Sequence, residues 1–310
     1  MRLLSASFVV LLGVGCVGPS DDPTNVHDLR VLAVQFEPPE IMAPRCTADA
    51  TNLAVFAFPV KMTVLVADPA GANRRLDYAV RACARSGDRR CDDEGDFKEL
   101  SRGTIPSGES QFILSPGGAL LDEVDPSTKF NVPLLERVAE YDAYGGLGGL
   151  RMPVDFAVKA GDEAVDAQKL MVFSCPLLPA MRANKTPVLP GVTWNGTVWG
   201  ETDVPEFKGE GPFDLAPLPF EERQETYVVP SFSLKPVTLV ESWKIAWYAD
   251  MGRLSPQETG GTDVDGTTGR HRAQWKPGST AMAGTVHFWF VVRDGRGGIS
   301  WLSRSATWAP

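Results

Sequence analysis

Cysteines are the residues of this 310-residue sequence whose spacing says most about covalent chemistry. Beyond the first thirty residues the sequence holds four of them, Cys46, Cys83, Cys91 and Cys175. In a chain that carries an export signal, described below, an even number favours two disulfides, and four cysteines allow three pairings. Cys83 and Cys91 flank a short charged stretch, so we expect a local bridge between them. That bridge would leave Cys46 to pair with Cys175. Zinc is the rival interpretation, but neither CxxC spacing nor histidine ligands accompany these cysteines.

Acid–base catalysis has few residues to draw on. The sequence contains three histidines, and the motifs GxSxG, HExxH and SxxK are absent. His287 alternates with Phe288 in a strand-like run, which favours an outer sheet face for the histidine. Aspartate and glutamate are plentiful, so a hydrolase that uses carboxylates alone remains an alternative. Residues 262–266 and the acidic stretch 201–225 could offer oxygen ligands to calcium, although the third acid and the final glutamate of an EF-hand loop are missing.

Tryptophans offer a second kind of chemistry, the stacking of flat ligands. In the run 241–250, Trp243 and Trp247 share a face that we expect in the core. In the run 285–292, Val286 and Phe288 predict a core face, which places Trp289 with His287 on the opposite face. If Trp301 lay across from Trp289, the pair would form a platform for sugars or a partner protein. The competing interpretation is that loops or another domain cover both indoles.

The first fifteen residues have the features of an export signal. Arg2 precedes an apolar run that ends at residue 14 and is too short to span a bilayer. Residues 13–16 (GVGC) resemble the lipobox of bacterial lipoproteins, except that the leucine usual three residues before the cysteine is replaced by Gly13. This resemblance implies that Cys16 carries a diacylglycerol and anchors the protein to a membrane. Val17, which follows it, favours the outer membrane in the sorting habit known for some lipoproteins.

Composition excludes several classes of protein. Hydrophobic residues make up 43% and charged residues 22%, as in an ordinary globular protein. The formal net charge is -9 and no lysine- or arginine-rich stripe occurs, so we expect no nucleic-acid partner. After Cys16 no apolar stretch is long enough to span a membrane.

Two shifts in composition divide the mature chain. All cysteines lie before residue 176 and all eight tryptophans after residue 193. The prolines and glycine of residues 182–191 favour a linker between them. We therefore predict a signal at 1–15, a lipidated tether at 16–28, a disulfide-stapled domain at 29–182, a linker at 183–190 and a tryptophan-rich domain at 191–310.

Both halves have the grammar of β-strands separated by turns. In the first, strands are predicted at 29–36, 61–69 and 76–83, with a hairpin at 153–175 around Gly161, and one helix at 133–143. In the second, strands are predicted at 224–234, 241–250, 285–292 and 299–308, while 200–223 is predicted to be an irregular loop.

The run 242–248 (SWKIAWY) resembles the central tryptophan-bearing strand of an immunoglobulin-like (Ig-like) sandwich, and 285–301 resembles its last hairpin. The runs 29–41, 61–71 and 76–84 resemble the opening strands of a second such domain. Together they are similar to a group of Gram-negative bacterial lipoproteins with Ig-like domains. The resemblance implies an all-β protein with two sandwiches, although the cysteine–tryptophan–cysteine spacing of antibody domains is absent.

From these features we favour a lipid-anchored envelope protein with a structural or binding role and without catalysis or a cofactor. Its expected partners are the membrane, through the lipid, and another envelope protein or a glycan. The alternatives are a carbohydrate-binding module that uses Trp289, Trp301 and His287, and a carboxylate-dependent hydrolase of envelope polymers.

Overall fold

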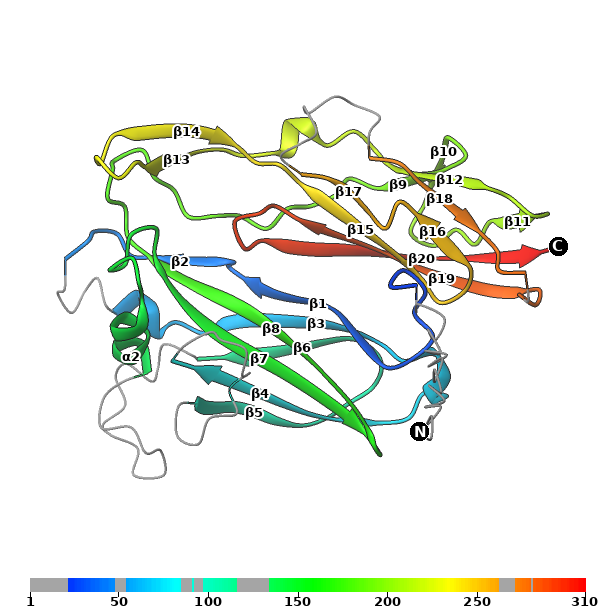
Figure 1. Ribbon diagram of the computed structural model, residues 1–310, viewed down its shortest axis with the longest axis horizontal. Helices are drawn as coiled ribbons and strands as arrows, with labels where there is room; N and C mark the ends of the chain where they lie inside the picture. The colour runs from blue at the N-terminus through cyan, green and yellow to red at the C-terminus, as the bar shows by residue number, and fades with distance from the viewer. Residues whose placement is uncertain are drawn as a thin grey trace, which may run out of the picture.

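The computed structural model describes residues 22–47, 54–84, 91, 97–115, 134–261, 271–279 and 281–310. The predicted export signal, Cys16, the start of the tether and the possible calcium loop at 262–266 lie outside these residues. Within the described chain, no helix combines the length and the apolarity that a membrane span requires. Figure 1 shows two β-sheet bodies, one above the other, with the N-terminal half below.

The first body is a sandwich of a three-stranded sheet, in the order β1-β3-β6, and a five-stranded sheet, in the order β2-β8-β7-β4-β5. Its strands are β1 (Arg30–Glu37), β2 (Glu40–Met42), β3 (Val60–Ala67), β4 (Leu76–Cys83), β5 (Phe97–Ile105), β6 (Gly108–Leu114), β7 (Leu150–Ala160) and β8 (Glu163–Ser174). It also contains helix α2 (Leu134–Tyr141) and the short 3-10 turns η1 (Val55–Ala57) and η2 (Pro69–Gly71). Its core holds Phe36, Met62 and Phe156, each almost fully buried.

The second body pairs the sheet β10-β9-β12-β18-β16 with the sheet β11-β20-β19-β15-β17. Its strands are β9 (Val192–Trp194), β10 (Thr197–Trp199), β11 (Glu206–Lys208), β12 (Phe213–Pro217), β15 (Lys244–Ala249), β16 (Arg253–Ser255), β17 (Glu258–Gly260), β18 (Ala273–Lys276), β19 (Gly284–Arg293) and β20 (Ile299–Ala309). The 3-10 turn η4 (Glu221–Arg223) precedes a separate hairpin, β13 (Thr226–Pro230) and β14 (Pro236–Val240). As expected, Trp243, Trp247 and Phe288 lie in the core.

The two bodies share one topology. In each, an early strand pairs antiparallel within one sheet, as β1 does with β3 and β9 with β12. In each body a later short strand belongs to the other sheet, where it pairs in parallel with the last strand of that body. This strand is β2 in the first body, which pairs with β8, and β11 in the second body, which pairs with β20. Two facing sheets that are antiparallel except for these two strand pairs form the architecture of Ig-like sandwiches, so the predicted fold class is confirmed.

A shared cluster of apolar side chains joins the two bodies. It contains Leu32, Leu65 and Ala67 from the outer side of the β1–β3 sheet, and Ala246, Val291 and Ile299 from the second body. All are buried. The face of β19 that points away from its own core is therefore covered by the first body.

The predicted tether needs a correction over its described part, residues 22–28. The amide of Val26 donates to the Ala249 carbonyl at 2.7 Å, and the Ala249 amide donates to the Thr24 carbonyl at 2.9 Å. The side chain of Val26 is fully buried in the cluster between the bodies. Polar residues and prolines suggested a free segment, but this stretch finds unpaired backbone groups at the end of β15 and satisfies them.

The structure confirms most of the predicted helices and strands and corrects one predicted loop. Helix α2, the turn at Gly161 and the main strands of both bodies are confirmed. The prediction of an irregular loop over 200–223 was wrong in part, because β11 and β12 lie within it and β12 is a central strand of its sheet. Buried Phe207, Phe213 and Leu215 explain why these short strands form.

Candidate functional site

The two tryptophans predicted for a stacking platform lie on β19 and β20, on the face that the first body partly covers. Trp289 pairs with Ser303, and Trp301 pairs with Val291, so the two indoles are not directly opposite. Both are half-buried and pack against the cluster between the bodies. The first body thus covers much of the face on which a ligand would stack.

His287 lies at the edge of this face and is half-exposed. Its ring Nδ1 lies 2.6 Å from the Asp250 carboxylate, which also accepts the His287 amide at 2.8 Å. The hydrogen bond to Asp250 raises the pKa of His287 above its ordinary value of 6.5, and partial burial opposes the shift. His287 therefore closes the turn after β15, next to the docked N-terminal segment.

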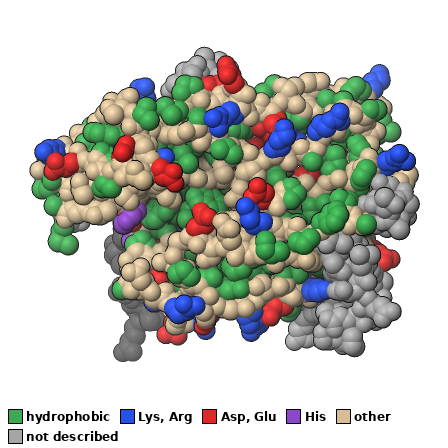
Figure 2. All heavy atoms as spheres, turned by 180° about the vertical axis from the view of Figure 1, so that it is seen from behind, with side chains coloured by type: hydrophobic (Ala, Val, Ile, Leu, Met, Phe, Trp, Pro, Cys, Tyr) green, Lys and Arg blue, Asp and Glu red, His purple; other side chains and the backbone are tan. Residues whose placement is uncertain are grey.

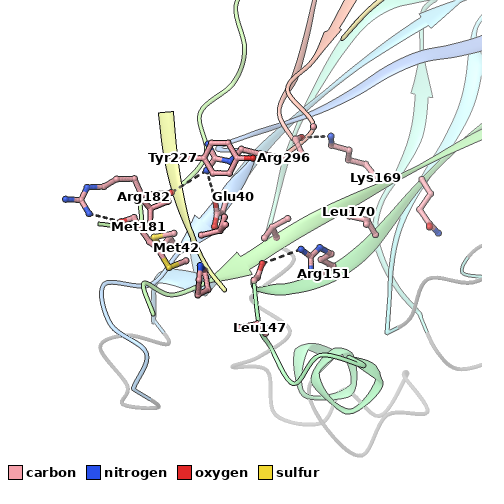
Figure 3. Close-up of a pocket in the computed structure, with 18 residues that line it drawn as sticks. Glu40, Met42, Leu147, Arg151, Lys169, Leu170, Met181, Arg182, Tyr227 and Arg296 are labelled. Atoms are coloured by element: carbon pink, nitrogen blue, oxygen red, sulfur yellow. Dashed lines mark hydrogen bonds and ion pairs between the residues drawn. The ribbon is translucent and has the colours of Figure 1, made fainter. Parts of the chain in front are cut away.

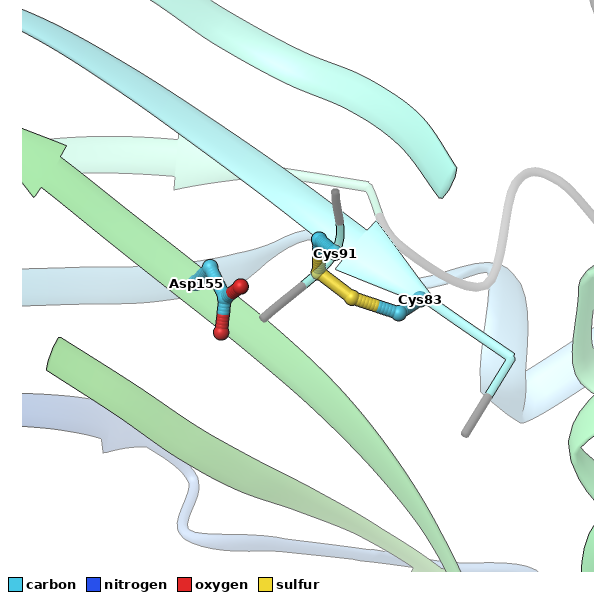
Figure 4. Close-up of side chains that lie close together, drawn as sticks. All are labelled: Cys83, Cys91 and Asp155. Atoms are coloured by element: carbon cyan, nitrogen blue, oxygen red, sulfur yellow. A yellow bond between two sulfur atoms is a disulfide. The ribbon is translucent and has the colours of Figure 1, made fainter. Parts of the chain in front are cut away.

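The disulfides join Cys46 to Cys175 and Cys83 to Cys91, the pairing that the spacing favoured. Cys83, Cys91 and Asp155 are the one group of potential metal ligands that meets in the described part of the chain (Figure 4). Because the two sulfur atoms are bonded to each other, only the Asp155 carboxylate could serve as a ligand, and it accepts a hydrogen bond from Gln168 at 2.9 Å. This group has a structural role.

A cavity of about 590 Å³ lies where the two bodies and the linker meet. It is lined by β2, β8 and residues 147–151 of the first body, by Met181 and Arg182 of the segment between β8 and β9, and by β13 and the β19–β20 turn of the second body (Figure 3). Its volume is that of a small-molecule site, and clefts between domains often hold ligands. This cavity, the interdomain cleft, is the candidate site.

The wall of the cleft on the second body is built around Arg296, at the tip of the β19–β20 turn. Its guanidinium donates to Glu225 at 3.2 Å and to Glu241 at 3.1 Å, and lies 3.9 Å from Glu40 of the first body. It also stacks on the ring of Tyr227, 4.1 Å from the centroid. The Arg296 side chain is only 14% exposed, so three carboxylates and one ring hold a nearly buried cation.

The turn that carries Arg296 is itself fixed by Asp294. The Asp294 carboxylate is buried and accepts the Arg296 amide at 2.7 Å and the Gly298 amide at 2.9 Å. It also accepts the side-chain amide of Asn184 in the linker at 2.7 Å. A Cβ on Gly298 would lie 2.1 Å from this carboxylate, so the residue must be glycine. Asp294 thus joins the linker to the turn at this edge of the cleft.

Lys169 of β8 reaches across the cleft. Its ammonium donates to the Gly297 carbonyl at 2.5 Å. Burial lowers the pKa of Lys169 to about 8, an effect that Asp294 opposes and Arg293 reinforces. The cation therefore sits in a partly desolvated place where carboxylates only partly compensate it.

The carboxylates around Arg296 do not suit a hydrolase. Glu241 accepts the indole N–H of Trp243 at 2.9 Å, and Glu40 accepts the Asn184 amide at 2.7 Å. Glu225 binds Arg296 and also Lys185 at 2.9 Å. The oxygens of these three carboxylates are engaged in the contacts named here, so these acids are not a free pair that could flank a scissile bond.

Sequence reasoning missed this cleft. Arg296 and Lys169 lie 127 positions apart, and neither belongs to a motif. Between the strands predicted at 285–292 and 299–308, Arg296 lies among three glycines, and its charge was the only signal. No spacing rule connects it to Glu40 or to Tyr227.

Charge elsewhere on the surface is mixed. On the face seen in Figure 2, acidic and basic side chains are interspersed, and neither sign gathers into a stripe. A second hollow of about 490 Å³ lies beside the Cys46–Cys175 bridge and is lined by Phe56, Leu150 and Leu177. It adjoins Thr47, after which residues 48–53 are not described, so the interdomain cleft is the better-defined site.

No family model matches the chain, and no curated protein matches its sequence. Similar solved structures include the red sea bream transglutaminase, at 10% identity and a TM-score of 0.23, over 92% of this chain and 32% of that one. Another is the α2-macroglobulin of E. coli, at 10% identity and a TM-score of 0.26, over 92% of this chain and 17% of that one. A third is the Ig1-2 module of a Drosophila receptor tyrosine phosphatase, at 11% identity and a TM-score of 0.22, over 91% and 98%.

The chain thus spans less than a third of the length of the first two proteins. Similarity at this level says nothing about function. Topology and sheet packing define the class, a pair of Ig-like sandwiches, and an architecture of this kind serves many unrelated functions.

Proposed function

We propose that this protein is a non-catalytic binding module of the bacterial cell envelope, which holds its ligand in the cleft between two firmly joined sandwiches. The observation that carries this proposal is the cleft itself, which both bodies and the linker build together. A site that needs both domains gives a reason for the buried cluster and for the Arg296 network that fix their geometry.

The second part of the proposal concerns location. Residues 13–16 match the pattern of a lipidation site closely enough to propose an acyl anchor on Cys16, and Val17 favours the outer membrane. Residue 22 is the first described residue, and the chain is docked from Thr24 onward. Only a few residues would then separate the lipid from the folded body, which would keep it close to the membrane surface.

Fractionation of cells tests the anchor. The unaltered protein is expected in the membrane pellet, and the Cys16→Ala form is expected in the soluble periplasmic fraction, because the thiol that takes the lipid is gone. A Val198→Ala form serves as a control, since it alters an exposed side chain and keeps Cys16 and both disulfides. If the Cys16→Ala form stays in the pellet, something other than an acyl group anchors the protein.

A further inference from the structure

The cleft is richer in cations than in anions. Its described lining contains four basic side chains, those of Arg151, Lys169, Arg182 and Arg296, and one acidic side chain, that of Glu40. Arg296 is paired with carboxylates, as shown above. The remaining three are paired differently, and their pairing indicates what the cleft accepts.

Carbonyl oxygens are the acceptors that the structure gives these three cations. Arg151 donates to the carbonyls of Gly148 and Gly149 at 3.5 and 3.3 Å. Lys169 donates to the Gly297 carbonyl, and Arg182 donates to the carbonyls of Pro179 and Met181. A carbonyl dipole satisfies an N–H but leaves the positive charge in place, so this side of the cleft carries net positive charge.

Arg151 and Lys169 both line the cleft, but they extend from opposite faces of the β7–β8 hairpin, because Arg151 pairs with Val172 and Lys169 pairs with Val154. In Figure 3, Arg151 and Lys169 lie on the side of the cleft formed by β7 and β8, whereas the guanidinium of Arg182 points away from it. Glu40, Tyr227 and Arg296 form the opposite side. The ammonium of Lys169 has three N–H donors and the structure shows one of them in use, so donors remain for a ligand.

Apolar side chains line the rest of the cleft. Leu170 and Met42 belong to the first body, and Val229 belongs to the β13 strand that overhangs it. A ligand that satisfied both parts of the lining would have an anionic group at one end and an apolar part beside it.

We propose that the interdomain cleft binds a small organic carboxylate, whose anionic group lies against the ammonium of Lys169 and whose apolar part extends along the apolar lining of the cleft toward Val229 of β13. The inference rests on the proposed function, because it names the chemistry of the ligand that the binding module holds. Both bodies contribute to the site, so a ligand of this kind also stabilises their contact.

Binding of this kind is coupled to protons through Lys169. The charged groups that act on its ammonium are Asp294 and Arg293 of the second body. Three further charged residues, Glu40, Arg151 and Arg296, line the same cleft. In the free protein the pKa of Lys169 is about 8, and a bound carboxylate raises it. Affinity therefore falls as the pH rises above about 8, and binding near that pH takes up protons.

Calorimetry with octanoate tests the proposal on the full chain in its Cys16→Ser form, which carries no acyl group. Octanoate is expected to bind more tightly at pH 7 than at pH 9.5, while 1-octanol, which has the same chain without the charge, binds at least about tenfold more weakly. Inorganic phosphate at matched ionic strength controls for screening of the surface charges.

Variants connect the binding to the cleft. Lys169→Met is expected to weaken octanoate at least about tenfold, and Lys169→Arg is expected to retain it at pH 7 and to remove the loss at pH 9.5. Lys159→Met is the matched control, because Lys159 is at an exposed position of β7 in the same hairpin. It is expected to leave octanoate binding unchanged. Circular dichroism verifies that each variant is folded. If Lys169→Met does not fold, the binding of octanoate to Lys169→Arg at pH 9.5 is the test.

Three results would overturn the inference: no octanoate binding, equal binding of octanoate and octanol, or unchanged binding in both Lys169 variants. Hydrogen exchange separates this failure from that of the proposed function. If octanol alone protects the amides of β8 and β13, the cleft is a binding site and only the carboxylate is wrong. If neither probe protects them, the proposed function loses its support as well.

Discussion

Arg296 shows how one side chain can hold two domains. It is almost buried, and the charge it carries is compensated by carboxylates from three separate places in the sequence, Glu40, Glu225 and Glu241. Burying ions costs free energy, and mutual attraction offsets that cost only when the partners are well placed. The arrangement is therefore a better device for fixing geometry than for adding stability.

Removal of this one cation should be costly for the same reason. In Arg296→Met, the carboxylate of Glu241, whose side chain is 2% exposed, loses the guanidinium that pairs with it. We expect the free energy of unfolding to fall by about 3–5 kcal/mol, measured by urea denaturation at pH 7. Arg102→Met is the control, because Arg102 is 64% exposed and pairs with Glu99 on the surface, so its removal should lower the stability far less. Equal losses in the two variants would contradict this account of the Arg296 network.

At the scale of elements, the N-terminal segment behaves as an added edge rather than a tether. Asn25 forms a parallel bridge with Ala249, and the Thr24 hydroxyl accepts the Leu254 amide at 3.2 Å. The segment continues directly into β1 of the first body. One short stretch thus touches the second body before the chain enters the first, and it would transmit any pull on the proposed lipid anchor to both.

Val26 is the side chain that secures this segment, since it is fully buried in the cluster between the bodies. We expect Val26→Ala to lower the free energy of unfolding by about 1–3 kcal/mol and to speed hydrogen exchange of the residue-26 amide, which donates to Ala249. Val198→Ala, at a strand position where the side chain is 60% exposed, should change stability by less than about 0.5 kcal/mol. A Val26→Ala protein as stable as the unaltered one would show that the docked segment contributes nothing.

For the whole molecule, two separate cores are joined by a third, smaller cluster. The cores share no residue, and the cluster between them draws on the outer faces of β1, β3, β15 and β19. Because that cluster and the Arg296 network cross the boundary, we expect the two sandwiches to unfold together in one calorimetric transition.

Leu65→Asp tests this cooperativity. Leu65 is 3% exposed and belongs to the shared cluster, not to the first core, so a charge there opposes docking and leaves each sandwich intact. The expected result is two resolved transitions, with the less stable sandwich melting at a lower temperature. Ile113→Asp, on the same sheet but 71% exposed, should keep the single transition. A single transition in Leu65→Asp would mean that the domains are coupled by other contacts.

The alternation of apolar and polar residues predicted many of the strands, because it is a local signal in the sequence. Trp243, Ile245 and Trp247 recur at every second position, and consecutive residues of a strand lie on opposite faces, so these three share one face. The strands that were not predicted lack a clear alternation of this kind. Strand β6 is half exposed and reads GESQFIL, and β11 is three residues long, so neither has a periodicity that stands out.

The sequence by itself determined the all-β class, the two cores and a preferred pairing of the cysteines, because composition, alternation and short spacings are local signals. It also predicts the export signal and the lipidation of Cys16. Only the tertiary structure decided that the first body covers Trp289 and Trp301, that residues 22–28 dock, and that Glu40, Lys169 and Arg296 meet around one cleft. These features depend on how two finished sandwiches pack against each other. Side chains brought together by such packing lie far apart in the chain, and no local pattern records their contact.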